Sequence, residues 1–159
     1  MIDTDTNKVA IRAALPSDID AIKGCVGRAY EHYITRIGKP PGPMLADYAD
    51  VIATHHVWVA ELNAVTVGVL ALMENAEGVL LDNVAVDPTA QGQGIGKRLM
   101  AHAEAAARQL GYRELRLYTH ELMTENIAMY GRLGYRQTER RSEAGYRRVY
   151  MSKSLTAKQ

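Results

Sequence analysis

Residues 80–111, LLDNVAVDPTAQGQGIGKRLMAHAEAAARQLG, carry the strongest structural signals in this chain. They predict an apolar strand, a turn at Asp87-Pro88, a glycine-rich loop and a helix that begins near Gly94. Gly92, Gly94 and Gly96 alternate where that helix begins, so its first backbone N–H groups are unpaired and no Cβ obstructs them. A helix start of this kind binds phosphate groups.

The spacing of the glycines separates three types of phosphate-binding loop. A P-loop that ended at Gly96-Lys97 would need glycine in place of Gln91 and a hydroxyl in place of Arg98. A dinucleotide fingerprint would need a third glycine where Lys97 stands, after the first strand of a parallel unit. The third pattern, Gln/Arg-x-x-Gly-x-Gly/Ala, is satisfied by Gln91, Gly94 and Gly96.

Composition limits the class of protein. The 159 residues suit one domain over residues 1–159, with residues 1–7 expected to be flexible and 155–159 to form a tail. The polar N-terminus does not resemble a secretory signal, and no apolar run approaches the ~18 residues that cross a bilayer, so we expect a cytoplasmic protein without a membrane partner. The net charge of +1 provides no general attraction for nucleic acid. Cys25, the only cysteine, rules out an internal disulfide, and we expect no metal site.

Alternating and helical patterns give an element order of β-α-α-β-β-β-α-β-α-β-β. We expect strands at residues 8–14, 57–62, 65–74, 79–86, 114–119, 135–143 and 146–154, and helices at 16–38, 44–54, 94–110 and 125–133. Ser17 and Thr124 are the expected helix caps. Asn63-Ala64 and Ala144-Gly145 are the expected hairpin turns.

Two further motifs connect the glycine loop with a known family. Residues 83–88, NVAVDP, lead into the loop, and residues 126–130, NIAMY, precede LGY at 133–135. With the loop, these segments resemble the GNAT N-acetyltransferases, which use acetyl-coenzyme A. The resemblance implies one α/β (α+β) domain: a mixed, mostly antiparallel sheet of six to seven strands, flanked by about four helices.

The resemblance also implies an activity, namely transfer of an acetyl group from acetyl-CoA to a primary amine of a small molecule or peptide, by direct attack in a ternary complex. It places the pyrophosphate on the loop, the pantetheine arm along the strand before it, and a hydrogen bond to pantetheine at Asn126. The residues expected to bind the cosubstrate are Val84, Ala85, Val86, Gln91, Gly92, Gln93, Gly94, Ile95, Gly96, Lys97, Arg98, Asn126 and Tyr130.

The family pattern places a tyrosine, here Tyr130, within reach of the sulfur as general acid, although a core aromatic residue is the alternative. Many members carry a catalytic base at a place that corresponds to Leu80 or Asp82, and leucine cannot act. Asp82 is therefore the first candidate, before Glu74, Glu121 and His120.

Amine recognition in the family falls to the first helices and the last hairpin, which here offer Tyr30, Tyr33 and Tyr146. A cationic cluster near the C-terminus is open to two interpretations, a solvated face of two strands or an anion-binding patch. It consists of Arg132, Arg136, Arg140, Arg141, Arg147, Arg148 and Lys153. Exposed strands at the expected C-terminal hairpin would allow a homodimer. A non-catalytic acyl-CoA-binding or sensing domain is the main alternative, and a nucleotide-binding module is disfavoured by the loop spacing.

Overall fold

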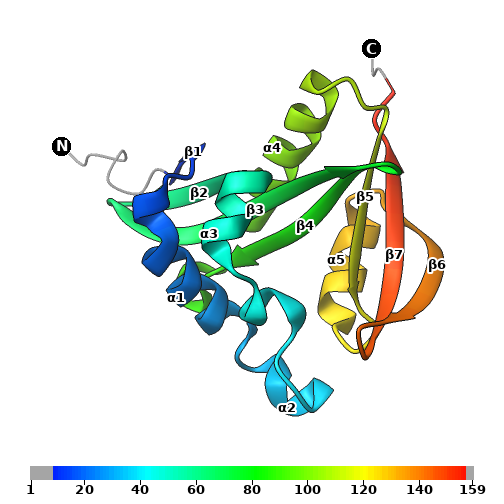
Figure 1. Ribbon diagram of the computed structural model, residues 1–159, viewed down its shortest axis with the longest axis horizontal. Helices are drawn as coiled ribbons and strands as arrows, with labels where there is room; N and C mark the ends of the chain where they lie inside the picture. The colour runs from blue at the N-terminus through cyan, green and yellow to red at the C-terminus, as the bar shows by residue number, and fades with distance from the viewer. Residues whose placement is uncertain (1–8, 157–159) are drawn as a thin grey trace.

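The computed structural model describes residues 9–156, and its seven strands form one sheet in the order β1-β2-β3-β4-β5-β7-β6 (Figure 1). All neighbouring strands are antiparallel except β4 and β5, which are parallel. The expected mixed, mostly antiparallel sheet is confirmed. The strands are β1 Val9–Ala13, β2 His56–Leu62, β3 Val65–Asn75, β4 Gly78–Val86, β5 Glu114–His120, β6 Arg136–Glu143 and β7 Tyr146–Ser154.

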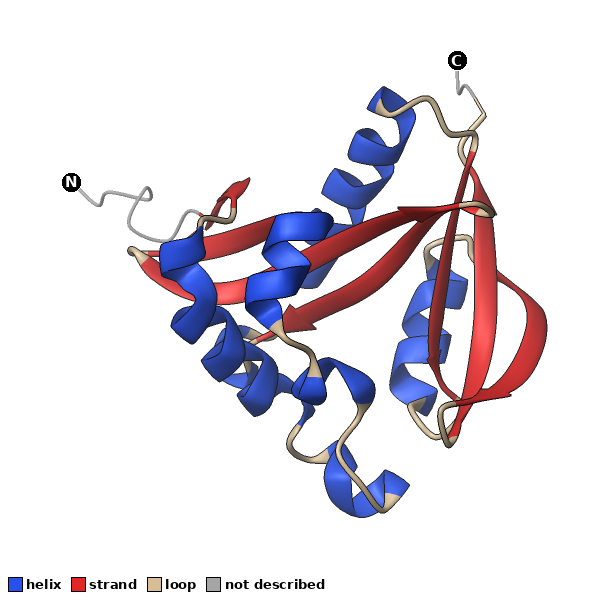
Figure 2. Ribbon diagram, viewed as in Figure 1, coloured by secondary structure: helices blue, strands red, loops and turns tan. Residues whose placement is uncertain are grey.

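Helices cover both faces of the sheet (Figure 2). One hydrophobic core packs α1 and α3 against β2, β3 and β4, and the other packs α4 and α5 against the opposite face. Gly68 of β3 allows α4 to approach closely, because a Cβ there would lie 3.0 Å from Leu99 Cδ1 and 3.3 Å from Ile95 Cγ2, both on α4. The helices are α1 Ile19–Tyr30, α2 Tyr33–Ile37, α3 Tyr48–Thr54, α4 Ile95–Gln109 and α5 Thr124–Arg132.

Strands β4 and β5 separate along their length (Figure 1). Their pairing is confined to Val79–Leu81 of β4 and Leu115–Leu117 of β5. Asp82 then has no partner in β3, because Ala71 pairs with Asn83 while Leu72 pairs with Leu81. Such a bulge bends and twists a strand. The rest of β4 pairs only with β3, and β5 continues with β7, so a gap opens between the two halves of the sheet.

The predicted helix at residues 16–38 is not continuous. A 3-10 turn, Pro16–Asp18, precedes α1, and Glu31 and His32 separate α1 from α2. The backbone stays helical at both residues, but Ile34 N donates to Glu31 O three residues back. Apolar periodicity runs through such a local change in hydrogen bonding, which is why the sequence did not reveal it.

Three predicted details of helix ends were wrong. Ser17 makes no capping bond, because the carboxylate of Asp18 accepts from Leu15 N and holds the turn. The second predicted helix begins at Tyr48, because Asp47 caps it with bonds from the backbone of residues 49 and 50. Thr124 is the first residue of α5 rather than its cap.

The expected hairpins are confirmed, since Leu62 pairs with Val65 and Glu143 with Tyr146. The expected flexible segment at 1–7 and residues 157–159 of the expected tail lie outside the described residues. Leu155 is buried in the core, and its N–H donates to Arg113 O. No helix in the described part of the chain is long and apolar enough to span a membrane.

Candidate active site

A cleft of about 500 Å³ lies between the end of β4, the start of α4 and the helix α5. We call it the glycine-loop cleft. Of the residues expected to bind a cosubstrate, those that line it are Val84, Ala85, Val86, Gln91, Gly92, Gly94, Ile95, Gly96, Lys97, Asn126 and Tyr130. Gln93 and Arg98 do not line it, and Arg98 Nη1 instead donates to Val9 O at 2.8 Å.

The glycines shape the start of α4. Gly92 and Gly94 have φ of +86° and +76°, in the left-handed region that favours glycine, and Gly94 is the N-cap. The first helical hydrogen bond runs from Arg98 N to Gly94 O, so the three preceding N–H groups have no acceptor within the helix. A Cβ on Gly92 or Gly94 would meet nothing within 4 Å. This open row of N–H groups fits a pyrophosphate.

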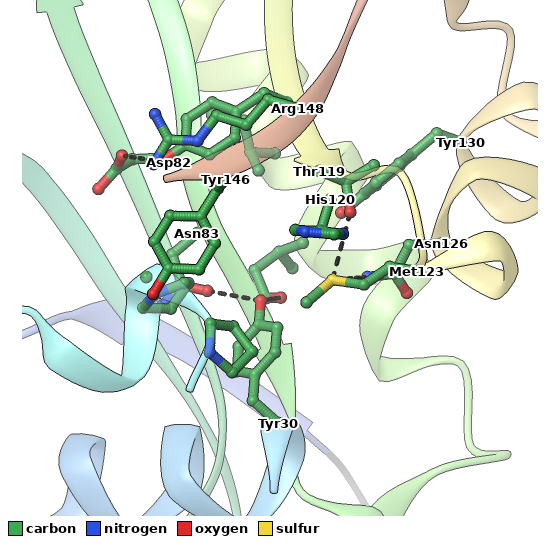
Figure 3. A pocket seen from close by; sticks show the side chains of 16 residues that line it. Tyr30, Asp82, Asn83, Thr119, His120, Met123, Asn126, Tyr130, Tyr146 and Arg148 are labelled. Atoms are coloured by element: carbon green, nitrogen blue, oxygen red, sulfur yellow. Dashed lines mark hydrogen bonds between the residues drawn. The ribbon is translucent and has the colours of Figure 1, made fainter. Parts of the chain in front are cut away.

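A second cavity, the inner pocket, adjoins the cleft between the separated strands (Figure 3). Tyr130 and Asn126 reach it from α5, and Asp82, Asn83 and Tyr30 lie on the opposite side. Tyr30, Val84, Asn126 and Tyr130 line both spaces. A molecule in the cleft and a molecule in the inner pocket would therefore meet at these residues.

Tyr130 is 4% exposed, and its hydroxyl makes no hydrogen bond to any residue from 9 to 156. Burial raises its pKa, so the hydroxyl keeps its proton through the neutral range. Asn126 is the third residue of α5, and its Nδ2 lies 3.6 Å from Met123 Sδ rather than capping the helix. Both side chains are available to a ligand.

Asp82 is the bulged residue of β4, and its side chain is 26% exposed. Its Oδ1 lies 3.5 Å from the hydroxyl of Tyr118, and its Oδ2 lies 3.9 Å from Nε2 of His55. Burial raises the pKa of Asp82, whereas the charge of protonated His55 opposes that rise. A carboxylate with a raised pKa at a cavity is suited to accept a proton.

His55 was missed at the sequence level, because nothing local connects the end of α3 with β4. The Thr54 hydroxyl donates to Asp50 O at 2.8 Å, so at 2.8 Å from His55 Nδ1 its oxygen acts as acceptor. The neutral ring therefore carries its proton on Nδ1 and directs the Nε2 lone pair toward Asp82.

The register between β5 and β7 assembles the far wall of the inner pocket. His120 pairs with Arg148 and Tyr118 with Tyr150, so alternate residues of both strands share one face. Tyr118, His120, Tyr146 and Arg148 line the pocket on that face.

The other candidate bases are less suitably placed. His120 Nδ1 accepts the Leu122 N–H at 3.0 Å, so the neutral ring presents an N–H donor at Nε2. Glu74 and Glu121 are absent from the inner-pocket lining. Glu74 bonds to His56 and Tyr112, and Glu121 pairs with Arg140 and Arg147.

The three tyrosines expected at the amine site occupy different places. Tyr146 lines the inner pocket, and its hydroxyl donates to Pro40 O at 2.5 Å. Tyr30 lines both spaces with a buried hydroxyl 2.9 Å from Asn83 Oδ1 and Val84 O. Tyr33 lines only the cleft, 3.4 Å from Glu125 Oε1.

Two other features of the sequence have structural explanations. Cys25 is fully buried in the α1 core, and burial raises the pKa of its thiol to about 12, which suits packing. Most of the C-terminal cations are ion-paired: Arg140 and Arg147 with Glu121, Arg141 with Glu139 and Glu143, Arg148 with Glu143, and Lys153 with Glu104.

Comparison with known proteins identifies the family. The family model of the acetyltransferase (GNAT) domain matches residues 53–137, more than half of the chain. The chain belongs to the GNAT acetyltransferase family. The matched region contains Asp82, Tyr130 and the part of the glycine-loop cleft that β4, α4 and α5 form.

Two solved structures share the fold of this GNAT domain, and one curated protein matches part of its sequence. The PaiA N-acetyltransferase of Thermoplasma acidophilum, solved with coenzyme A, has a TM-score of 0.78 at 16% identity, covering 92% of this chain and 99% of that one. The yncA structure of Salmonella typhimurium, with its cofactor acetyl-CoA, has a TM-score of 0.72 at 21% identity, covering 94% and 95%. Mouse N-alpha-acetyltransferase 80 is 35% identical over 68 residues, which are 43% of this chain but only 20% of that protein.

Proposed function

We propose that this GNAT domain transfers the acetyl group of acetyl-CoA to a primary amine of a small molecule or peptide, by direct attack within a ternary complex. The observation that carries this proposal is the shared wall of the two cavities. Tyr130, Asn126 and Val84 border both spaces, so a thioester that enters from the cleft meets an amine in the inner pocket.

The chain's own groups would bind the cosubstrate. N–H groups at the start of α4 hold the pyrophosphate, with the positive end of the helix dipole and Lys97 nearby. Within residues 9–156 no strand pairs with Val84–Val86 on the β5 side. Apart from Val84 O, which accepts from the Tyr30 hydroxyl, this backbone is available to pair with the pantetheine arm. A main-chain N–H of the same segment would stabilise the oxyanion.

Proton movements are assigned to two side chains. Asp82 accepts the proton that the amine loses, aided by the raised pKa of its carboxylate. Tyr130 donates its proton to the thiolate that leaves as the new C–N bond replaces the C–S bond. The hydroxyl of Tyr130 suits this role, because Tyr130 borders both cavities and its hydroxyl is protonated when the thiolate forms beside it.

The test is acetyl-CoA turnover with an amine panel, read as free thiol, in the native chain and in Tyr130→Phe. We expect kcat to fall roughly 10²-fold, while calorimetry finds coenzyme A binding little changed. Tyr135→Phe is the matched control, because it also removes a buried hydroxyl, one bonded to Glu104 outside both cavities.

Two results would contradict the proposal. An unchanged kcat in Tyr130→Phe, with chemistry shown to be rate-limiting, would exclude Tyr130 as the acid. Tight coenzyme A binding without turnover of any amine would favour a non-catalytic acyl-CoA-binding domain.

A further inference from the structure

We infer that the acceptor is a small zwitterionic amine, whose amino group lies at Asp82 while its carboxylate binds Arg148. This inference rests on the proposed function, because it assigns the acceptor class of the same site. Its basis is a guanidinium on the inner pocket together with a loop that closes over that pocket.

Arg148 is anchored on one side and open on the other. Its side chain is only 19% exposed, its Nη1 donates to Glu143 Oε1 at 3.2 Å, and its Cζ lies 4.3 Å from the Tyr118 ring centroid. Nε and Nη2 make no hydrogen bond within residues 9–156. Arg148 lines the inner pocket and also a neighbouring cavity that shares Asp82 with the inner pocket. These two donors are therefore available to a ligand in the inner pocket.

Glu143 does not use all of the hydrogen-bond donors of the Arg148 guanidinium. Glu143 Oε1 also accepts the Tyr150 hydroxyl at 2.6 Å, and Glu143 Oε2 pairs with Arg141 at 3.4 Å. Glu143 therefore holds Arg148 by one nitrogen rather than by a bidentate pair. A planar carboxylate suits the remaining donors, because guanidinium and carboxylate match in geometry as well as in charge.

The second charge on the pocket has the opposite sign. Asp82 lines the inner pocket together with Arg148, and the positive charge of Arg148 acts to lower the pKa of Asp82. An acceptor with one ammonium and one carboxylate would complement both groups. A polyamine would place an additional positive charge near Arg148, and that repulsion selects against it.

The loop before α3 limits the size of the acceptor. Pro41, Gly42 and Pro43 line the inner pocket, and the loop is bonded to the β6–β7 hairpin at two points. Tyr146 donates to Pro40 O at 2.5 Å, and Lys39 Nζ donates to Gly145 O at 2.6 Å. Tyr48 adds a bond to Pro43 O at 2.6 Å. This closure favours a compact molecule over a polypeptide segment.

The test uses α- and ω-amino acids and their matched carboxamides. Free-thiol release gives the ratio of kcat/KM for each acid to that for its amide. Calorimetry on coenzyme A-saturated protein gives the same preference as Kd without requiring turnover. In the native chain we expect the acids to be preferred, and in Arg148→Gln we expect that preference to fall roughly 10- to 100-fold. In Arg148→Lys the preference for acids should fall less, because lysine keeps the positive charge. It should still fall, because lysine lacks the planar fork of donors.

Arg147→Gln is the matched control. Arg147 is the neighbour of Arg148 on β7, its side chain is 74% exposed, and it does not line the pocket. Arg147→Gln removes one positive charge from the same strand but none from the pocket. The preference for acids over amides should therefore stay as in the native chain. An equal loss in both variants would indicate a general charge effect and overturn the inference.

The two readouts separate this inference from the proposed function. Turnover of amides at least as efficient as that of acids would refute the zwitterion and leave the acetyltransferase intact. Binding of acids through Arg148 without turnover would support the binding site and contradict the reaction. Failure of every acid to bind would overturn the inference, whether or not another amine is acetylated.

Discussion

Asn83 Nδ2 donates a 3.1 Å hydrogen bond to the hydroxyl of Tyr48, which joins β4 to α3 beside the inner pocket. The Tyr48 hydroxyl in turn donates to Pro43 O at 2.6 Å, and Asn83 Oδ1 lies 2.9 Å from the hydroxyl of Tyr30. Both polar atoms of the buried Asn83 amide are thus paired. This network links the loop that covers the pocket to the strand at its base.

Tyr48→Phe should destabilise the fold by about 1–3 kcal/mol, because Asn83 Nδ2 and Pro43 O would lose their partner in a buried place. Thermal unfolding should show a decrease in Tm of several degrees. Tyr112→Phe is a suitable control, since its hydroxyl bonds to exposed Glu74 and its loss should change Tm little. Equal Tm values for Tyr48→Phe and the native chain would mean that the network contributes no stability.

Gly96→Leu tests the glycine-loop cleft, with Gly96→Ala as its matched control. A Cβ at Gly96 would lie 3.7 Å from Val86 Cγ2, an ordinary contact, and alanine favours helix by about 0.5–1 kcal/mol over glycine. We therefore expect Gly96→Ala, which the loop pattern allows, to have unchanged or higher Tm and to bind coenzyme A about as the native chain does. The longer side chain of Gly96→Leu occupies space in the cleft, so calorimetry should find weaker coenzyme A binding. A substitution at Gly94 would confuse the two effects, since its φ of +76° strains any side chain. Undiminished binding in a folded Gly96→Leu protein would place the ligand elsewhere.

The succession of elements along the chain and the start of α4 could be predicted because they depend on local patterns. Alternation of apolar residues marked the strands, and glycine spacing marked the loop. The break between α1 and α2 could not be predicted, because Glu31 and His32 stay helical and only the hydrogen bonding changes.

The surroundings of Asp82 depend on contacts between distant segments. Its prediction as base rested on family resemblance, and the bulge that turns it toward the gap exists only in the pairing of β3 with β4. His55 reaches it from the end of α3, and Tyr118 reaches it from β5. Arg148 stood in a cationic cluster with two open interpretations, and only the register of β5 with β7 distinguishes it from its neighbours.

The pH dependence of kcat should identify Asp82 as the base. The carboxylate accepts a proton only when it is ionised, so kcat should fall as the pH drops through the pKa of Asp82. Burial raises that pKa, so the decline should lie above the usual aspartate value of ~3.9. Asp82→Asn should lower kcat and abolish this acidic limb, and a limb that persists in Asp82→Asn would assign the proton to another group.

His55 provides a second and more specific test of the same carboxylate. Protonated His55, with Nε2 at 3.9 Å from Asp82 Oδ2, lowers the pKa of Asp82 and so opposes the effect of burial. His55→Gln removes that charge, and we expect the acidic limb of kcat to move to higher pH. His56→Gln is the matched control, because the side chain of His56 is 41% exposed and pairs with Glu74 rather than with Asp82. A shift to lower pH in His55→Gln, or equal shifts in both variants, would show that His55 does not act on the carboxylate of Asp82.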